Sequence, residues 1–431
     1  MRRGAYTLAL YAAAPLAWLW MARRARRAGG EWGIFSPARF GRADPAEPAP
    51  FARPPVWVHA VSLGETRAAQ PLVQALLDAG LPVLLTHTTA TGRAEGARLF
   101  GQAIAAGQLR QTWLPYDFPG AVRGFLQRHT PRCGLLIERE VWPNLLAQAR
   151  RQGVRMALVS ARFSVSSLRQ AGWMGTALRD ALAGLDAVLA QTPEDARRLE
   201  QAGARRVRVT GNLKFDLDLP ADQVQAGRAW RQALGRPVVV VASTREGEDV
   251  PFAQAMRARS GAGRPVLYVL IPRHPQRFDA AAGQLRAAGL SCVRRSALQG
   301  RLQDLPPVEG AVDVVLGDSL GEMAFYYAAA DVAIVAGSFA PLGGQNLIEA
   351  CAAGVPVVVG PHTFNFKQAA EDAIAAGAAL RAADPPAALD AAQSLLDDDE
   401  RRQAMGRAAQ AWSATHAGAT RRTLQALQAW L

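Results

Sequence analysis

Short apolar runs alternate with amphipathic stretches along most of the chain. Residues 56–61 and 82–86 are apolar and rich in β-formers, and the spacing of apolar positions between them predicts a helix over 65–79. This alternation is typical of parallel sheets covered by helices on both faces. It restarts in the second half, where strands are expected at 238–242, 266–271, 313–316, 332–335 and 355–359. The predicted fold class is α/β, with two Rossmann-like doubly wound domains whose strand carboxyl ends face a shared cleft.

The same pattern divides the 431 residues into segments. Half of the residues are apolar, and a chain of this length exceeds what one hydrophobic core usually serves. Proline and charge between the halves indicate a linker with a short helix, and the end of the chain has helical periodicity. We expect an N-terminal anchor at 1–27, a first domain at 50–212, a linker at 213–236, a second domain at 237–399, and a terminal helix at 400–431 that packs back on the first domain.

The first residues carry a membrane signal. Residues 5–21 are uncharged and include aromatic side chains, and four arginines follow within 22–27. A helix over 5–21 would be about 26 Å long, the short end of what spans a bilayer, so a spanning helix and an in-plane helix both fit. A cleaved signal peptide fits less well, because arginines occupy the positions of its cleavage site. These arginines predict an inner-membrane anchor that keeps the domains in the cytoplasm.

Composition narrows the function further. The three cysteines lie far apart without paired spacing, which indicates a reducing compartment and no disulfide or zinc framework. The formal charge is +13, but the arginines are scattered, so an anionic membrane or substrate is expected rather than nucleic acid. Of 49 basic residues only Lys214 and Lys367 are lysine, which suggests positions that need a compact ammonium group. Asp216 and Asp218 resemble a metal-binding pair but fall in the predicted linker, so no metal is expected.

A glycine-rich segment at 337–357 predicts a nucleotide-sugar site. Gly343 and Gly344 allow the backbone to approach an anion closely, and Asn346 is expected to open a helix whose N–H groups face that anion. Glu349 follows one turn later on the same helix face, where its carboxylate can accept two hydrogen bonds from a ribose diol. The alternative is an ordinary turn between a helix and a strand with glycine caps.

Other strand ends of the second half add candidate ligand groups. Arg273 is a natural phosphate clamp, and the hydroxyl groups of Ser243 and Thr244 could bind a phosphate or a carboxylate. Residues 317–323 follow another strand end and belong to the same set. Each of these alone is more often a cap or a turn.

Glu65 is the candidate base of the first half. It lies in Ser62-Leu-Gly-Glu65 between a strand and a helix, so it is also the fourth residue of a capping box, and both roles fit. A helix N-terminus is expected to keep the pKa of Glu65 low. As a base it would accept the proton of an acceptor hydroxyl while the new bond forms.

Two further carboxylates and a lysine complete the first half of the site. Glu138 and Glu140 end a strand two residues apart, so at most one faces the cleft if the strand continues; Glu138 is preferred, with Glu140 as the alternative. Lys214 lies at the junction of the two halves, where it could oppose charge on a leaving phosphate or a donor carboxylate. A surface lysine is the alternative.

Nine motifs in series resemble the 3-deoxy-D-manno-octulosonic acid (Kdo) transferases of lipopolysaccharide synthesis over nearly the whole chain. Arg139 and Val141 occupy positions where that family is expected to have Thr and Leu. The motifs span residues 59–65, 88–92, 114–117, 138–144, 211–216, 242–246, 272–275, 317–323 and 343–357.

The resemblance implies a GT-B glycosyltransferase that transfers Kdo with inversion from CMP-Kdo to lipid IVA, the lipid A precursor, at the inner membrane. It implies that Glu65 is the base and that Glu138 and Lys214 stabilise the transition state. No cofactor is implied. The residues expected to hold the donor are Ser243, Thr244, Pro272, Arg273, Gly321, Glu322, Met323, Gly343, Gly344, Gln345, Asn346, Leu347, Ile348 and Glu349.

Two other functions remain open on the sequence. Another membrane-associated GT-B enzyme that uses a UDP-sugar would share the glycine-rich segment. A non-catalytic nucleotide-binding membrane protein would bind CMP but would not need Glu65.

Overall fold

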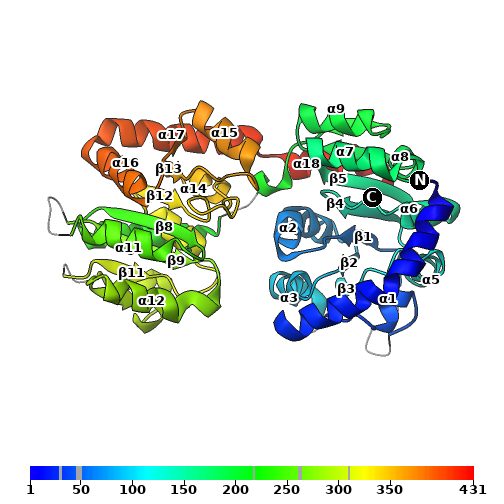
Figure 1. Ribbon diagram of the computed structural model, residues 1–431, viewed down its shortest axis with the longest axis horizontal. Helices are drawn as coiled ribbons and strands as arrows, with labels where there is room; N and C mark the ends of the chain where they lie inside the picture. Colours follow the sequence, from blue (N-terminus) through cyan, green and yellow to red (C-terminus); the bar gives the residue numbers. More distant parts are fainter. Residues whose placement is uncertain (29–31, 45–50, 217–218, 261–264, 309–310) are drawn as a thin grey trace. The chain divides into compact units, whose positions relative to one another are not determined.

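The computed structural model describes residues 1–28, 32–44, 51–216, 219–260, 265–308 and 311–431. The chain forms two compact units (Figure 1), one made of Met1–Leu217 with His416–Leu431 and the other of Asp218–Thr415. Each unit contains a parallel sheet of seven strands among its described residues. The prediction of two doubly wound α/β domains is therefore confirmed.

Unit 1 has the strand order β3-β2-β1-β4-β5-β6-β7. The chain moves outward from β1 to β3, returns to β4 beside β1, and continues outward on the other side. The strands are β1 (Val56–His59), β2 (Val83–His87), β3 (Leu109–Trp113), β4 (Cys133–Ile137), β5 (Arg155–Ala161), β6 (Ala187–Ala190) and β7 (Val207–Val209).

Helices cover both faces of this sheet, because successive residues of each buried strand point to opposite sides. Trp57, Leu84 and Leu136 belong to one core layer and Val58, Leu85 and Leu135 to the other. The helices are α1 (Arg3–Ala28), α2 (Leu63–Asp78), α3 (Ala90–Leu99), α4 (Gly101–Ala105), α5 (Pro119–His129), α6 (Pro143–Arg151), α7 (Val165–Met174), α8 (Thr176–Ala183), α9 (Pro193–Gln201) and α18 (Ala419–Leu427).

Unit 2 has a related but different order, β10-β11-β9-β8-β12-β13-β14, in which β11 lies between β9 and the edge strand β10. Its strands are β8 (Val238–Thr244), β9 (Leu267–Pro272), β10 (Cys292–Arg294), β11 (Val314–Leu316), β12 (Val332–Val335), β13 (Val357–Val359) and β14 (Ala379–Arg381). Its helices are α10 (Ala221–Leu234), α11 (Asp249–Arg257), α12 (Phe278–Ala287), α13 (Met323–Ala329), α14 (Ile348–Ala352), α15 (Lys367–Ala375), α16 (Pro385–Asp397) and α17 (Asp399–His416).

The predicted linker at 213–236 is corrected by the structure. Most of its second part is α10, which packs on α13 through Trp230 and Phe325, whose ring centroids are 5.5 Å apart. Arg231 also forms an ion pair with Asp331 at 2.6 Å. Residues 217–218 of the linker lie outside the described residues. A helix with a buried face and a partly buried ion pair is a structural part of unit 2 rather than a linker.

The predicted terminal helix at 400–431 is two helices. Gly418 has a left-handed backbone with φ of 86°, which separates α17 from α18. Met405 of α17 lies in the core of unit 2, whereas α18 belongs to unit 1. Asp216 accepts hydrogen bonds from the backbone N–H groups of Gly418 and Ala419 and so caps α18, a structural role for a residue that had suggested a metal pair.

Candidate active site

Each sheet has a central point where the chain reverses its winding direction, and several candidate residues lie at or just after the ends of the strands that meet there. In unit 1 this point lies between β1 and β4, where His59 pairs with Leu136. In unit 2 it lies between β8 and β12, where Ala242 pairs with Val335. Open parallel sheets bind ligands outside the carboxyl ends of the strands at this point, because the flanking helices there lie on opposite faces and leave a crevice.

Glu65 follows β1 and lies in the first turn of α2. Its Oε2 accepts a hydrogen bond from the backbone N–H of Ser62 at 2.9 Å, so the capping role is realised. The expectation of a low pKa is nevertheless wrong: burial, followed by the negative charges of Glu138 and Glu140, raises the pKa of Glu65 to about 7. Backbone hydrogen bonds from Ser62 and Val61 lower this pKa, but by less than burial and the two nearby carboxylates raise it.

Glu138 is the first residue after β4 and has a left-handed backbone with φ of 64°. Its backbone N–H donates to the carbonyl of Val159 on β5 at 3.0 Å, which holds the strained residue in place. Its carboxylate, buried in the protein, forms an ion pair with Lys214, with Nζ and Oε1 2.6 Å apart. The structure thus brings together two residues that are 76 positions apart in the sequence.

Glu140 belongs to the same group, so the choice between Glu138 and Glu140 is not exclusive. The strand ends at Ile137, and the alternation of strand side chains no longer applies to them. Glu140 accepts a hydrogen bond from Trp142 Nε1 at 2.8 Å, and its Oε2 lies 3.8 Å from His59 Nε2.

His59 is a site residue that the sequence reasoning did not single out. Its side chain is fully buried, and its Nδ1 lies 3.1 Å from the carbonyl oxygen of Thr86. Within the described part of the chain, its Nε2 has no hydrogen-bond partner. The sequence did contain a signal for this residue, because His59 is the last residue of β1 and shortly precedes Glu65.

In unit 2, the loops after β8 and β12 are tied together by a buried carboxylate that was also missed. Glu248 is 2% exposed and accepts backbone hydrogen bonds from Arg245, Gly337, Phe339 and Ala340 at 2.7 to 3.1 Å. Next to it, Ser243 has φ of 63° where the pairing of β8 with β9 shifts register, and Thr244 is fully buried. These contacts join the loop that directly follows Ser243 and Thr244 to the start of the glycine-rich segment.

The glycine turn has the backbone that the sequence predicted. Gly343 has φ of 93°, and a Cβ at this position would lie 2.3 Å from Asn365 Nδ2. Gly344 has φ of 77° and donates its N–H to the carbonyl of Gly337 at 2.7 Å. A side chain is therefore excluded at Gly343 both by conformation and by space.

The helix expected to begin at Asn346 begins at Ile348 instead. Asn346 Oδ1 accepts the N–H of Ile348 at 3.0 Å, which forms a side-chain turn ahead of the helix. Asn346 Nδ2 lies 3.4 Å from Glu349 Oε1, so the two side chains still meet. Leu347 and Ile348 are buried. Because α14 has only five residues, its dipole would attract an anion less strongly than predicted.

Arg273, a predicted phosphate-binding residue, links the end of β8 to the glycine turn. Its Nε donates to Gln345 Oε1 at 3.2 Å, and its backbone N–H donates to the carbonyl of Thr244 at 3.0 Å. Pro272, which precedes it, is the last residue of β9.

The predicted segment Gly321, Glu322 and Met323 lies at the start of α13. Glu322 is held by Arg295 at 3.2 Å and by hydrogen bonds from Ser319 and Tyr326. Gly321, with φ of 82°, accepts a hydrogen bond from Gln223 Nε2 at 2.9 Å. The segment is thus anchored to α10, the helix that lies within the predicted linker.

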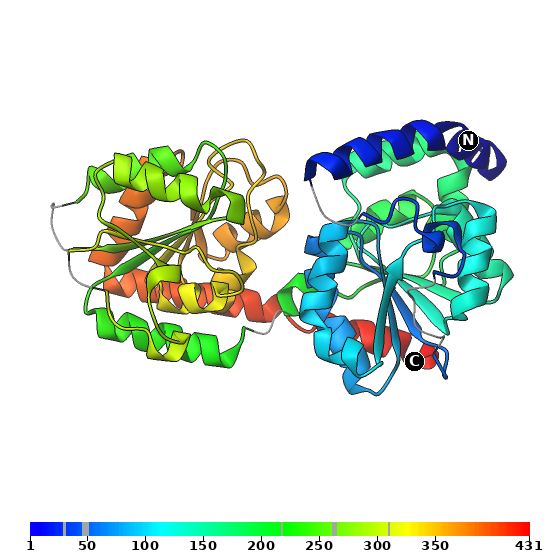
Figure 2. The ribbon, with the colours of Figure 1, turned by 90° about the horizontal axis from the view of Figure 1, so that it is seen from below.

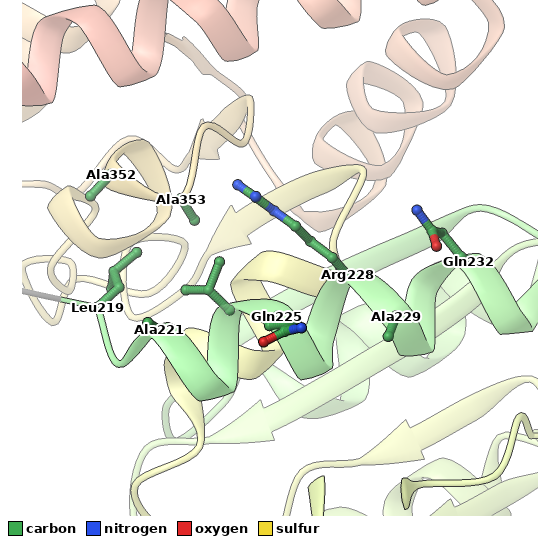
Figure 3. Close-up of a pocket in the computed structure, with 9 residues that line it drawn as sticks. Leu219, Ala221, Gln225, Arg228, Ala229, Gln232, Ala352 and Ala353 are labelled. Atoms are coloured by element: carbon green, nitrogen blue, oxygen red, sulfur yellow. The ribbon is translucent and has the colours of Figure 1, made fainter. Parts of the chain in front are cut away.

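The same helix lines a groove of about 680 Å³ in unit 2 (Figure 3), together with the end of α14. Its lining includes Val224, Arg228 and Ala353 and none of the predicted site residues. Within the described residues, no group of three or more His, Cys, Asp or Glu side chains is placed to hold a metal ion.

Known proteins resemble this chain along its whole length. Residues 36–217 match the family model described as 3-Deoxy-D-manno-octulosonic-acid transferase (kdotransferase), and residues 306–412 match that of Glycosyl transferases group 1. The chain is 71% identical over 435 residues to the 3-deoxy-D-manno-octulosonic acid transferase of Bordetella pertussis, with 100% of each chain covered. It is 31% identical over 385 residues to that of Haemophilus influenzae, with 87% of each chain covered.

Among solved structures, the UDP-GlcNAc 2-epimerase from Neisseria meningitidis bound to UDP-GlcNAc has a TM-score of 0.58 at 13% identity. The match covers 87% of this chain and 99% of that one. At this identity the likeness shows the fold alone, and together with the family models it confirms the predicted GT-B class.

Proposed function

Because the chain belongs to the 3-deoxy-D-manno-octulosonic acid (Kdo) transferase family of glycosyltransferases, we propose that it transfers Kdo from CMP-Kdo to a lipid A precursor such as lipid IVA. The observation that carries the proposal is Glu65, a carboxylate at the point where the sheet of unit 1 changes direction, with a pKa of about 7. A general base works best when its pKa lies near the operating pH, so this acid suits proton removal from a sugar hydroxyl.

The proposed step is a single displacement. The acceptor hydroxyl oxygen attacks the anomeric carbon of Kdo, its proton moves to the carboxylate of Glu65, and the bond from the anomeric carbon to the phosphate oxygen breaks with its electron pair on CMP. Attack from the side opposite the leaving group inverts the anomeric carbon.

Glu138 and Lys214 support this step in the proposal. Lys214 offsets the charge of Glu138 at 2.6 Å, which prevents three carboxylates from facing one another without a cation. Its ammonium group can also stabilise negative charge on the Kdo carboxylate or the leaving phosphate, because a compact cation in a partly buried site acts strongly on developing charge.

Unit 2 holds the donor in this proposal. Arg273 and the N–H groups of Gly343 and Gln345 bind the phosphate, with the hydroxyl groups of Ser243 and Thr244 beside them. The N–H of Gly344 instead holds the turn through the carbonyl of Gly337. The carboxylate of Glu349, next to Asn346 at 3.4 Å, accepts hydrogen bonds from the ribose diol. The rest of the donor site is formed by residues from three parts of the chain: Pro272, then Gly321, Glu322 and Met323, and finally Leu347 and Ile348.

The proposed location is the cytoplasmic face of the inner membrane. Arg3–Arg26 is long and apolar enough, by length and composition, to cross a membrane. The formal charge of +13 favours an anionic surface, and a phosphorylated lipid acceptor would be reached along that surface.

Mass spectrometry of the lipid A precursor tests the reaction. Wild-type protein with CMP-Kdo is expected to add a Kdo-sized increment, and Glu65→Gln is expected to slow its formation by roughly 10²–10⁴-fold while CMP still binds. Glu200→Gln, the same change at an exposed position of α9, is the control and should keep wild-type activity. An increment formed from a UDP-sugar but not from CMP-Kdo would overturn the proposed donor, and full activity of Glu65→Gln would overturn the proposed base.

A further inference from the structure

One face of α1 is docked on unit 1. Tyr6, Leu10, Ala14 and Trp18 are spaced four residues apart, so they lie on one face of the helix. Tyr6 is 8% exposed and Ala14 is 7% exposed. Leu10, Ala14 and Trp18 form a small cluster with Tyr116, Phe118 and Ala121. Figure 2 shows α1, in dark blue, running alongside unit 1 rather than away from it.

The docked face carries two side-chain hydrogen bonds to unit 1, of which the bond from Tyr6, here called the latch, is buried. Tyr6 donates its hydroxyl to Asp117 Oδ2 at 3.0 Å, and Thr7 donates to Asn144 Oδ1 at 3.0 Å. Asp117 also accepts the backbone N–H groups of Asn144 and Leu145, at the start of α6. If α1 left, this buried carboxylate would lose a donor, which is unfavourable.

The contact extends over most of the apolar segment. At one end, the carbonyl of Met1 accepts the N–H of Ala177 at 2.9 Å and the hydroxyl of Thr176 at 3.1 Å. Toward the other end, Trp18 packs against Phe40 and Tyr116, with centroids 5.6 and 5.7 Å apart. From Met1 to Trp18 a helix rises about 25 Å, so the docked length equals most of what a bilayer crossing requires.

The opposite face of α1 is apolar and exposed. Leu8 and Leu16 are each 73% exposed, Trp20 is 59% exposed and Leu19 is 49% exposed. Arginines flank this face: Arg23, Arg24 and Arg26 follow it, and Arg3 lines a groove of about 580 Å³ with Arg150 and Arg151. Large exposed apolar side chains bordered by cations fit the interface of a bilayer with anionic headgroups.

We infer that α1 lies in the membrane plane, with Leu8, Leu16, Leu19 and Trp20 in the lipid, and does not cross the bilayer. The inference rests on the proposed membrane location and adds to it the orientation of the anchor. A spanning helix would have to give up the Tyr6 latch and the packing of Trp18 at once, because both lie within the segment that would fill the hydrocarbon region. An in-plane helix keeps these contacts and covers its outer face with lipid.

Cysteine accessibility in cells distinguishes the two orientations. Gly4 is exposed and an added Cβ meets no atom within 4 Å, so Gly4→Cys should preserve the structure. Gly101→Cys, at a similarly open position of unit 1, is the matched control for the cytoplasmic side. Labelling of the native cysteines, of which Cys133 and Cys351 are buried, is measured on the wild-type protein and subtracted.

A spanning α1 with its arginines inside would place residue 4 outside the cytoplasm. For an in-plane helix, a membrane-impermeant maleimide should leave Gly4→Cys and Gly101→Cys unlabelled in intact spheroplasts and label both after detergent permeabilisation. Labelling of Gly4→Cys in intact spheroplasts, with Gly101→Cys protected and the protein in the membrane fraction, overturns the in-plane inference alone. Recovery of the protein in the soluble fraction overturns the membrane location as well.

Discussion

Both sheets of this protein reverse their winding direction between two central strands, but the carboxylates at their carboxyl edges have different surroundings. At the edge of unit 1, Glu65, Glu138 and Glu140 lie close enough that burial and mutual repulsion raise the pKa of Glu65 to about 7. At the edge of unit 2, Glu248 is more deeply buried than Glu65 but accepts four backbone N–H groups. A carboxylate without enough donors is prepared to take a proton, whereas one surrounded by donors holds loops in place.

Of the two acids compared, Glu65 and Glu248, the substitution of Glu65 is expected to have the largest effect. Glu65→Gln should lower kcat by roughly 10²–10⁴-fold, the usual contribution of a positioned base. CMP affinity should stay unchanged, because Glu65 belongs to unit 1. Steady-state kinetics with calorimetry of CMP binding measures both, and an equal loss of kcat and CMP affinity would contradict the separation of roles.

Removing the structural acid should affect the other unit. Glu248→Gln keeps the shape but offers one acceptor oxygen and places an NH₂ group against backbone donors, so unfolding should be easier by about 1–3 kcal/mol. CMP affinity should also fall, because the loop at 337–340 loses its support. Denaturant unfolding and CMP titration measure these effects. Glu246→Gln, two residues away and 62% exposed, is the control.

The pH dependence of the rate sharpens the electrostatic half of the comparison. Only ionised Glu65 can accept a proton, so kcat should rise with pH through about 7. Glu140→Gln removes a negative charge that raises the pKa of Glu65, so this rise should move to lower pH. A pH profile that is the same in wild type and Glu140→Gln would show that the carboxylates do not interact.

The smallest effect concerns the latch between α1 and unit 1. Tyr6→Phe removes the donor to buried Asp117 and should lower the free energy of unfolding by about 1 kcal/mol. Tyr11→Phe is the matched control, because the Tyr11 ring stacks on Phe118 at 4.5 Å and phenylalanine keeps that contact. Equal stability of both variants in thermal unfolding would count against the latch.

Most elements were predictable because their apolar patterns are long and regular. The β-branched runs of β8 and β12 match buried parallel strands, and the predicted ranges differ from the observed ones by a few residues at most. The predicted linker was wrong because the buried face of α10 consists of Ala226, Gly227 and Trp230, a weak apolar pattern whose partner Phe325 is distant in the sequence.

The sequence predicted which residues belong to the site better than it predicted their pKa values and hydrogen bonds. Glu65 could be named from its place after a strand. Its raised pKa depends on burial and then on Glu138 and Glu140, which the sequence places more than seventy positions away. His59 and Glu248 were missed because nothing local separates them from ordinary buried polar residues. The predicted start of the helix at Asn346 was wrong. The side chain of Asn346 accepts the N–H of Ile348, which competes with helix formation, and the sequence pattern does not show which of the two conformations is favoured.

The sequence by itself determined the α/β class, the two-domain organisation, the family and the glycine turn, because these depend on local periodicity, backbone freedom and ordered motifs. The tertiary structure decided the raised pKa of Glu65, the pairing of Glu138 with Lys214 and the docking of α1. The physical reason is that burial and electrostatic interaction depend on distances between residues far apart in the chain, and only folding sets those distances.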